Sequence, residues 1–152
     1  ILRRRFKSIL KRAMISFNYE TDFKLENSDR LSNWITETIL EENCKEGEIN
    51  YIFCDDDYLH KLNVEFLDHD TLTDIISFDY CVGKELHGDV YISIERVREN
   101  AMEFNVPFED ELHRVIIHGV LHYCGYKDKS ETDTKQMRFK EDNALEQLSN
   151  IN

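Results

Sequence analysis

The chain has 152 residues, of which 41% are hydrophobic and 11% aromatic; this composition predicts one folded domain with a full core and excludes a disordered chain. Its 19 lysines and arginines are outnumbered by 31 aspartates and glutamates, and the net charge of −12 is unusual for a protein that binds nucleic acid through phosphates. No apolar run approaches the roughly 18 residues that a membrane span needs.

The first 13 residues, ILRRRFKSILKRA, differ from the rest because they contain six basic residues and no acid. The remainder therefore has 13 basic against 31 acidic residues, a net charge of −18. The segment could be a basic arm for an anionic surface or a transit-like peptide. Because Met14 directly precedes a strand-like segment, we expect residues 1–13 to be an extension from cloning or from a misassigned start. The folded domain is expected at residues 14–150.

Hydrophobic periodicity predicts a strand-helix-strand-helix unit, then a hairpin-like pair of strands with a turn near Gly83, then three helices. The predicted strands are 15–20, 48–54, 73–81 and 88–94, and the predicted helices are 28–44, 55–67, 95–104, 107–124 and 130–148. Pro107 fits the first position of its helix, and Ser130 to Asp133 form a capping box. This order predicts an α+β domain in which helices pack against a small, mixed, four-stranded sheet.

Two acidic runs border predicted elements. Asp55, Asp56 and Asp57 could hold a cation, but capping of the helix that follows explains them better. The polar run 68–71 (DHDT) separates that helix from the third strand.

The most informative motif is His118-Gly-Val-Leu-His122, followed by Gly125 and Asp128. Histidines four apart lie on one helix face, about 5–6 Å from each other, so both imidazoles can reach one metal ion. A glycine three residues later can end the helix, and the reversed chain can bring Asp128 back as a third ligand. This spacing is typical of metzincin-type hydrolases, whose metal keeps an open coordination position.

The residues around the motif are apolar on nearly every side, which indicates a buried helix. The two histidines could instead be core residues that hydrogen-bond to carbonyl groups, but a pair at this spacing, followed by glycine and an acid, favours the metal site. Gly119 stands where metallopeptidases have their general base, so proteolysis is disfavoured and another hydrolysis is favoured. The missing side chain would admit a wider substrate or the close approach of a strand.

The four cysteines form no C-x-x-C pair, and no secretory segment precedes them. This pattern predicts reduced thiols in a cytoplasmic protein. Cys124 lies two residues after His122, so it should point away from the ligand face and into the core.

Four segments of the chain resemble the YbeY family of single-domain, metal-dependent endoribonucleases, which act in ribosomal RNA maturation and ribosome quality control. The matching residues are Leu62-Asn63 with Phe66 and Thr73-Asp-Ile-Ile-Ser-Phe78, then Gly88-Asp-Val-Tyr-Ile-Ser93, the His118 motif, and Met137-Arg-Phe-Lys-Glu-Asp142. The resemblance implies a zincin-like fold, a zinc site in a cleft between the motif helix and the sheet, and hydrolysis of RNA. Zinc, or another divalent metal, is expected once per chain at His118, His122 and Asp128.

The chain departs from the family pattern at two positions. Asp128, preceded by Lys127, stands where the family commonly has a third histidine; carboxylate is an acceptable zinc ligand, but it lowers the charge of the site from +2 to +1 and should make bound water less acidic. Leu67 stands where the family commonly has an arginine linked to activity. Arg98, Lys127 or Arg138 could substitute for that arginine, and the sequence does not distinguish between them.

The expected reaction is hydrolysis of a phosphodiester in single-stranded or ribosomal RNA, with RNA or ribosomal particles as partners. Asp74 and Ser77 should line the cleft as candidate catalytic residues, with a turn acid and a sheet serine as the alternative. Arg98 and Lys127 are candidate phosphate contacts, although solvated surface charges are the simpler explanation. Glu111 is expected on exposed helix surface, the alternative being a carboxylate that orients a metal ligand. No general base stands out, and a non-catalytic ribosome-associated factor remains a rival because the chain is so acidic.

Overall fold

The computed structural model describes residues 14–67 and 73–151. The basic segment 1–13 and the polar run 68–71 lie outside the described residues, so the expectations for them remain predictions. The strands are β1 (Ile15–Tyr19), β2 (Lys45–Cys54), β3 (Ile75–Asp79) and β4 (Glu85–Ser93). The helices are α2 (Ser28–Glu41), α3 (Asp56–Leu67), α4 (Ile94–Phe104), α5 (Phe108–Tyr123) and α6 (Glu131–Asn150).

The four strands form one mixed sheet in the order β1-β2-β4-β3. Strand β2 runs parallel to β1 and to β4, while β3 is antiparallel to β4 across the turn at Gly83. The predicted α+β class and the mixed four-stranded sheet are therefore confirmed. None of the helices in the described ranges is long and apolar enough to cross a membrane.

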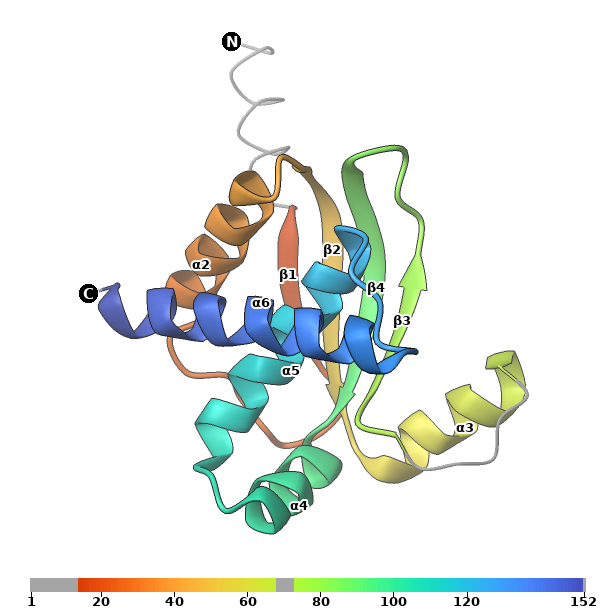
Figure 1. Ribbon diagram of the computed structural model, residues 1–152. Helices are drawn as coiled ribbons and strands as arrows, with labels where there is room; N and C mark the ends of the chain where they lie inside the picture. The colour runs from red at the N-terminus through yellow and green to blue at the C-terminus, as the bar shows by residue number, and fades with distance from the viewer. Residues whose placement is uncertain (1–13, 68–72, 152) are drawn as a thin grey trace, which may run out of the picture.

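Helices cover the two faces of the sheet unequally, as Figure 1 shows: α2, α5 and α6 lie across one face, while α3 lies apart near one edge. Strand alternation sorts the side chains between these layers. Toward α2, α5 and α6 the sheet presents Ile49, Tyr51, Phe53, Val90 and Ile92. Toward α3 it presents Cys54, Ile76, Phe78 and Tyr91. The alternation places Ile75 and Ser77 on the α5 side of β3.

Element bounds differ from the sequence patterns by at most three residues: β3 is two residues shorter at each end, β4 begins three residues earlier, and the other large difference lies at Gly47. Helix α2 ends at Glu41 and β2 begins at Lys45, three residues earlier than predicted, because Gly47 lies inside the strand and does not stop the helix. A Cβ at Gly47 would collide with the carbonyl oxygen of Leu86, and the β2–β4 register shifts between Glu46 and Ile49. The glycine therefore permits an irregular strand pair.

Helix starts follow their capping residues. The Asp55 carboxylate accepts the Tyr58 N–H at 2.8 Å, and the Ser130 hydroxyl accepts the Asp133 N–H at 3.0 Å, as predicted. Pro107 takes the N-cap position of α5 and not the first helical position, because its ψ of 146° is extended.

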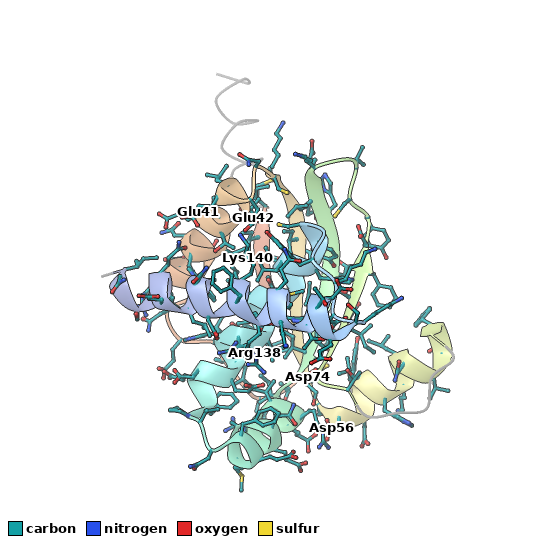
Figure 2. The ribbon with its side chains drawn as sticks, viewed as in Figure 1. Glu41, Glu42, Asp56, Asp74, Arg138 and Lys140 are labelled. Atoms are coloured by element: carbon teal, nitrogen blue, oxygen red, sulfur yellow. The ribbon has the colours of Figure 1, made fainter. Side chains whose placement is uncertain are left out.

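Helix α6 crosses α5 and is tied to α2 at several points. The Trp34 indole donates to the Ala144 carbonyl at 2.8 Å, and Lys140 pairs with Glu42 at 3.0 Å. Figure 2 shows Glu42 and Lys140 next to each other between the two helices. The Tyr126 hydroxyl donates to the other oxygen of Glu42 at 2.6 Å. These contacts fix α6 over the helix that carries the histidines.

Candidate metal centre and adjoining cleft

Helix α5 carries the two histidines on a face that lies close to the sheet. A Cβ at Gly119 would stand 3.3 Å from both Ile75 Cδ1 and Val90 Cγ1, tighter than most side-chain contacts. The missing side chain was expected to admit either a wider substrate or the close approach of a strand, and the structure shows the close approach of a strand. That approach sets His118 and His122 beside β3.

The chain reverses immediately after α5. Gly125 has a φ of 110°, which L side chains rarely adopt, and its N–H donates to the His122 carbonyl at 3.0 Å. The reversal brings Asp128 Oδ2 to 3.3 Å from His118 Nε2. A cavity of about 170 Å³ opens here, lined by Ile75, Ser77, His118, Gly119, His122 and Asp128. The structure therefore gathers all three predicted metal ligands and Ser77 around one small space.

Hydrogen bonds fix the outer nitrogen of each histidine. His118 Nδ1 is 2.7 Å from Glu141 Oε2, and His122 Nδ1 is 3.1 Å from the Tyr126 carbonyl oxygen. Glu141 is itself held by Arg114, whose Nη1 donates to Oε1 at 2.9 Å. Burial lowers the pKa of His118, but the hydrogen bond and charge of Glu141 outweigh it, so the pKa lies above its ordinary value. Because each Nδ1 is engaged, each Nε2 remains for the cavity.

The chemistry of these side chains fits a divalent metal. Carboxylate and carbonyl partners on Nδ1 are the usual outer contacts of metal-binding histidines, since they fix the tautomer that leaves Nε2 as ligand. Within residues 14–67 and 73–151, however, no three His, Cys, Asp or Glu side chains form a group that could hold a metal ion as placed. Asp128 already lies 3.3 Å from His118, and both Asp128 and His122 are exposed to solvent.

A larger cavity, about 460 Å³, adjoins the buried side of His118. Its walls come from the start of β3, α4, α5, α6 and the turn at Asp128. Asp74, whose carboxylate accepts the Asn100 amide at 3.4 Å, lies on the β3 side, and burial raises its pKa. Arg138 borders the cavity from α6, and Figure 2 shows it on the side of α6 nearest Asp74.

Comparisons with known proteins agree on one family. The family model described as "Endoribonuclease YbeY" matches residues 14–149. The chain belongs to the YbeY family. It is 62% identical to the endoribonuclease YbeY of Flavobacterium johnsoniae, over 87% of this chain and 95% of that protein, and 66% identical to that of Flavobacterium psychrophilum, over 87% and 94%. The solution structure of TM1509 from Thermotoga maritima superposes with a TM-score of 0.63 at 30% identity, covering 89% of each chain.

The other candidate residues lie in different places. Asp74 lines the larger cavity, as expected for a cleft residue. Arg98 stacks its guanidinium over the Phe108 ring, 4.5 Å from the centroid, and Lys127 is exposed beside Asp128; neither borders either cavity. Leu67, where the YbeY family commonly has arginine, is the last residue of α3.

The expectation that Glu111 lies on exposed helix surface is wrong. The residue is only 7% exposed and lines the larger cavity, because the α5 stripe that holds His118 continues under α6. It does not orient a histidine; Glu141 does that from another helix. Cys124 packs against the core, as predicted, and burial raises the pKa of its thiol.

Sequence reasoning missed Glu141 and Arg114 as parts of this YbeY site. Arg114 precedes His118 by one helical turn, and Glu141 follows the buried Met137 by one turn of α6. Those spacings place both residues on inward faces. The periodicity could have predicted that they are buried, but not that α6 crosses α5 at His118.

Proposed function

We propose that this YbeY-family protein is an endoribonuclease that cleaves phosphodiester bonds of ribosomal RNA, with one divalent metal ion, expected to be zinc, at His118, His122 and Asp128. The observation that supports this most is the fixed orientation of His118, whose Nδ1 meets the Glu141 carboxylate at 2.7 Å while Nε2 faces Asp128. Membership of the family supplies the reaction class.

An ion held there would supply positive charge that polarises a phosphoryl oxygen and eases the ionisation of water. The protein's own groups do the positioning. Glu141 and the Tyr126 carbonyl hold the two imidazole rings, and Arg114 fixes the Glu141 carboxylate by donating a hydrogen bond to it. Ser77 offers a hydroxyl at the wall of the small cavity, within the space where a phosphate would stand.

The phosphate of an approaching RNA needs a cation that is not already paired. In the described part of the chain, Arg96 and Arg114 form ion pairs, and Arg30 donates to carbonyl oxygens of α6 and Ile151. Arg138 is different, because it borders the cleft and makes no hydrogen bond or ion pair with any described residue. We therefore assign to Arg138 the phosphate contact that Leu67 cannot supply.

The test uses metal-stripped protein reloaded with zinc and incubated with single-stranded ribosomal RNA, with casein as a control substrate. Wild type should cleave the RNA, spare casein and contain one zinc per chain. Arg98→Gln is the matched control for Arg138→Gln, because the Arg98 guanidinium stacks on the Phe108 ring. Failure of the zinc-loaded protein to cut any RNA would refute the proposal.

A further inference from the structure

Glu111 is a largely buried residue whose carboxylate borders a cavity. The residue is 7% exposed, yet its side chain makes no hydrogen bond or ion pair with any residue that the structure describes. The other buried polar residues in the described ranges are all satisfied. Thr38 donates to a backbone carbonyl, Ser93 donates to Asp56, Glu141 meets Arg114 and His118, and Asn63 also has a partner. The Glu111 oxygens are not among the fully buried, unbonded side-chain atoms of the described residues, so they are open to the cavity and available to a ligand there.

The surroundings of Glu111 show where such a ligand would lie. Glu111 belongs to the first turn of α5, where the helix dipole favours negative charge. Burial nevertheless raises its pKa, and the charge of Asp74 raises it further. The nearby charges of Arg114 and Arg138 lower the pKa but do not reverse the shift. The side chain lines the 460 Å³ cavity beside His118, so a ligand in that cavity would meet its oxygens.

The cavity has the size and borders of a subsite for a flexible chain. Its volume lies within the range of small-ligand pockets. It continues into a second hollow of about 730 Å³, and four residues border both: Phe104, Glu111, Arg114 and Arg138. Phe104 is 57% exposed and offers a ring face, and Arg138 offers an unpaired cation. An aromatic ring beside an arginine suits a base and its phosphate.

We propose that this cavity is a nucleotide subsite next to the scissile bond, in which Glu111 accepts the N–H donors of a guanine base while Arg138 meets the adjoining phosphate. The inference rests on the proposed ribonuclease function and names a base preference for it. The phosphate belongs at Arg138 because an anion at Glu111 and Asp74 would be repelled.

Guanine is the base whose edge matches a carboxylate. Its Watson–Crick edge presents N1–H and the N2 amino group side by side, so both oxygens of one carboxylate can be satisfied. Uracil has a single N–H between two carbonyls, and adenine and cytosine place a ring-nitrogen acceptor beside their amino group. Single-stranded RNA exposes these edges to proteins. Glu111 should therefore select guanine over the other three bases.

The test compares single-stranded RNAs that carry one guanosine with the same RNAs carrying inosine, which lacks the N2 amino group. An RNA with 7-deazaguanosine, which keeps the Watson–Crick edge, serves as a positive control. Zinc-loaded wild type should cleave the guanosine RNA at least about tenfold more efficiently in kcat/KM than the inosine RNA. Binding of the same RNAs to metal-free protein, measured by fluorescence anisotropy, should show the same order.

Two variants assign the preference to Glu111. Glu111→Gln should bring the guanosine-to-inosine ratio close to one. Glu109→Gln makes the same charge change in the same helical turn, at an exposed residue that borders the adjoining hollow but not the 460 Å³ cavity, and should keep the ratio. Equal cleavage and binding of guanosine and inosine RNA by wild type would overturn the subsite while leaving the ribonuclease intact. A ratio in Glu111→Gln as high as in wild type would overturn the role of Glu111. If Glu111→Gln does not fold, the wild-type ratio alone decides.

Discussion

The two ends of the cleft differ in how completely their polar groups are bonded, although both stand on helix α5 within about two turns. At the His118 end, the imidazole meets Glu141 and Asp128, and Glu141 is held by Arg114. At the Glu111 end, Glu111 and Arg138 line the cavity without a hydrogen bond between them, although the charge of Arg138 lowers the pKa of Glu111. The bonded end suits the proposed metal ion, which needs fixed ligands, while the other end leaves groups open to the cavity for the proposed nucleotide.

Removal of a ligand at the bonded end should have the largest effect. His122→Ala should abolish both bound zinc and RNA cleavage, because two remaining ligands cannot hold the ion against water. Elemental analysis and a cleavage assay on the same preparation measure both. Cys124→Ser, which alters a core thiol, should retain one zinc per chain. Full zinc content in His122→Ala would remove His122 from the site.

Removal of the hydrogen bond between Glu141 and His118 should have the second-largest effect. Glu141→Gln removes the charge that fixes the imidazole, and zinc affinity should fall roughly 10- to 100-fold, as for other outer partners of metal-binding histidines. Competition with a chromophoric chelator gives the dissociation constant. Asp142→Asn is the matched control, because Asp142 contacts Arg114 but not His118. Unchanged affinity in Glu141→Gln would show that the orientation of His118 does not depend on this bond.

At the Glu111 end, Arg138→Gln should weaken RNA binding while leaving zinc content unchanged. One lost phosphate contact should reduce the slope of log affinity against log salt by about 0.7 for a single strand. Titrations of metal-free protein with labelled RNA at several salt concentrations give the slope. An equal loss in Arg98→Gln would show that general surface charge, and not the cleft, attracts the RNA.

The smallest expected effect concerns stability. The pKa of Glu111 is raised above its ordinary value of 4.5, so between the unfolded and folded pKa the native state binds more protons and stability falls as pH rises. Above the pKa of Glu111 in the folded protein, the loss of stability no longer changes with pH. Glu111→Gln should therefore melt at a higher temperature than wild type at pH 7, and the difference should vanish below pH 4.5. A lower melting temperature at pH 7 would mean that the carboxylate is satisfied in solution.

The sequence patterns predicted the order and type of all described elements because each strand or helix has its own period. They also predicted the convergence of His118, His122 and Asp128, since Asp128 follows the end of α5 by only five residues. The sequence patterns could not predict contacts between helices that are far apart in the sequence. Glu141 meets His118 only because α6 crosses α5, and Glu111 is buried only because the same helix covers it. Helical periodicity places Glu111 on the same stripe as His118 and Glu109 on the other side of the helix, but it does not show that α6 covers that stripe.

The position of Glu141 also constrains when the protein can work during its own synthesis. His118 and His122 emerge early with α5, but their ring orientation depends on a carboxylate that the ribosome adds 23 residues after His118. A nascent chain that has folded its sheet and α5 still lacks this carboxylate. The growing polypeptide is therefore without a finished site until α6 has been released and has docked. If the substrate is ribosomal RNA, as proposed, late completion of the site would keep an unfinished copy from cutting the ribosome that makes it.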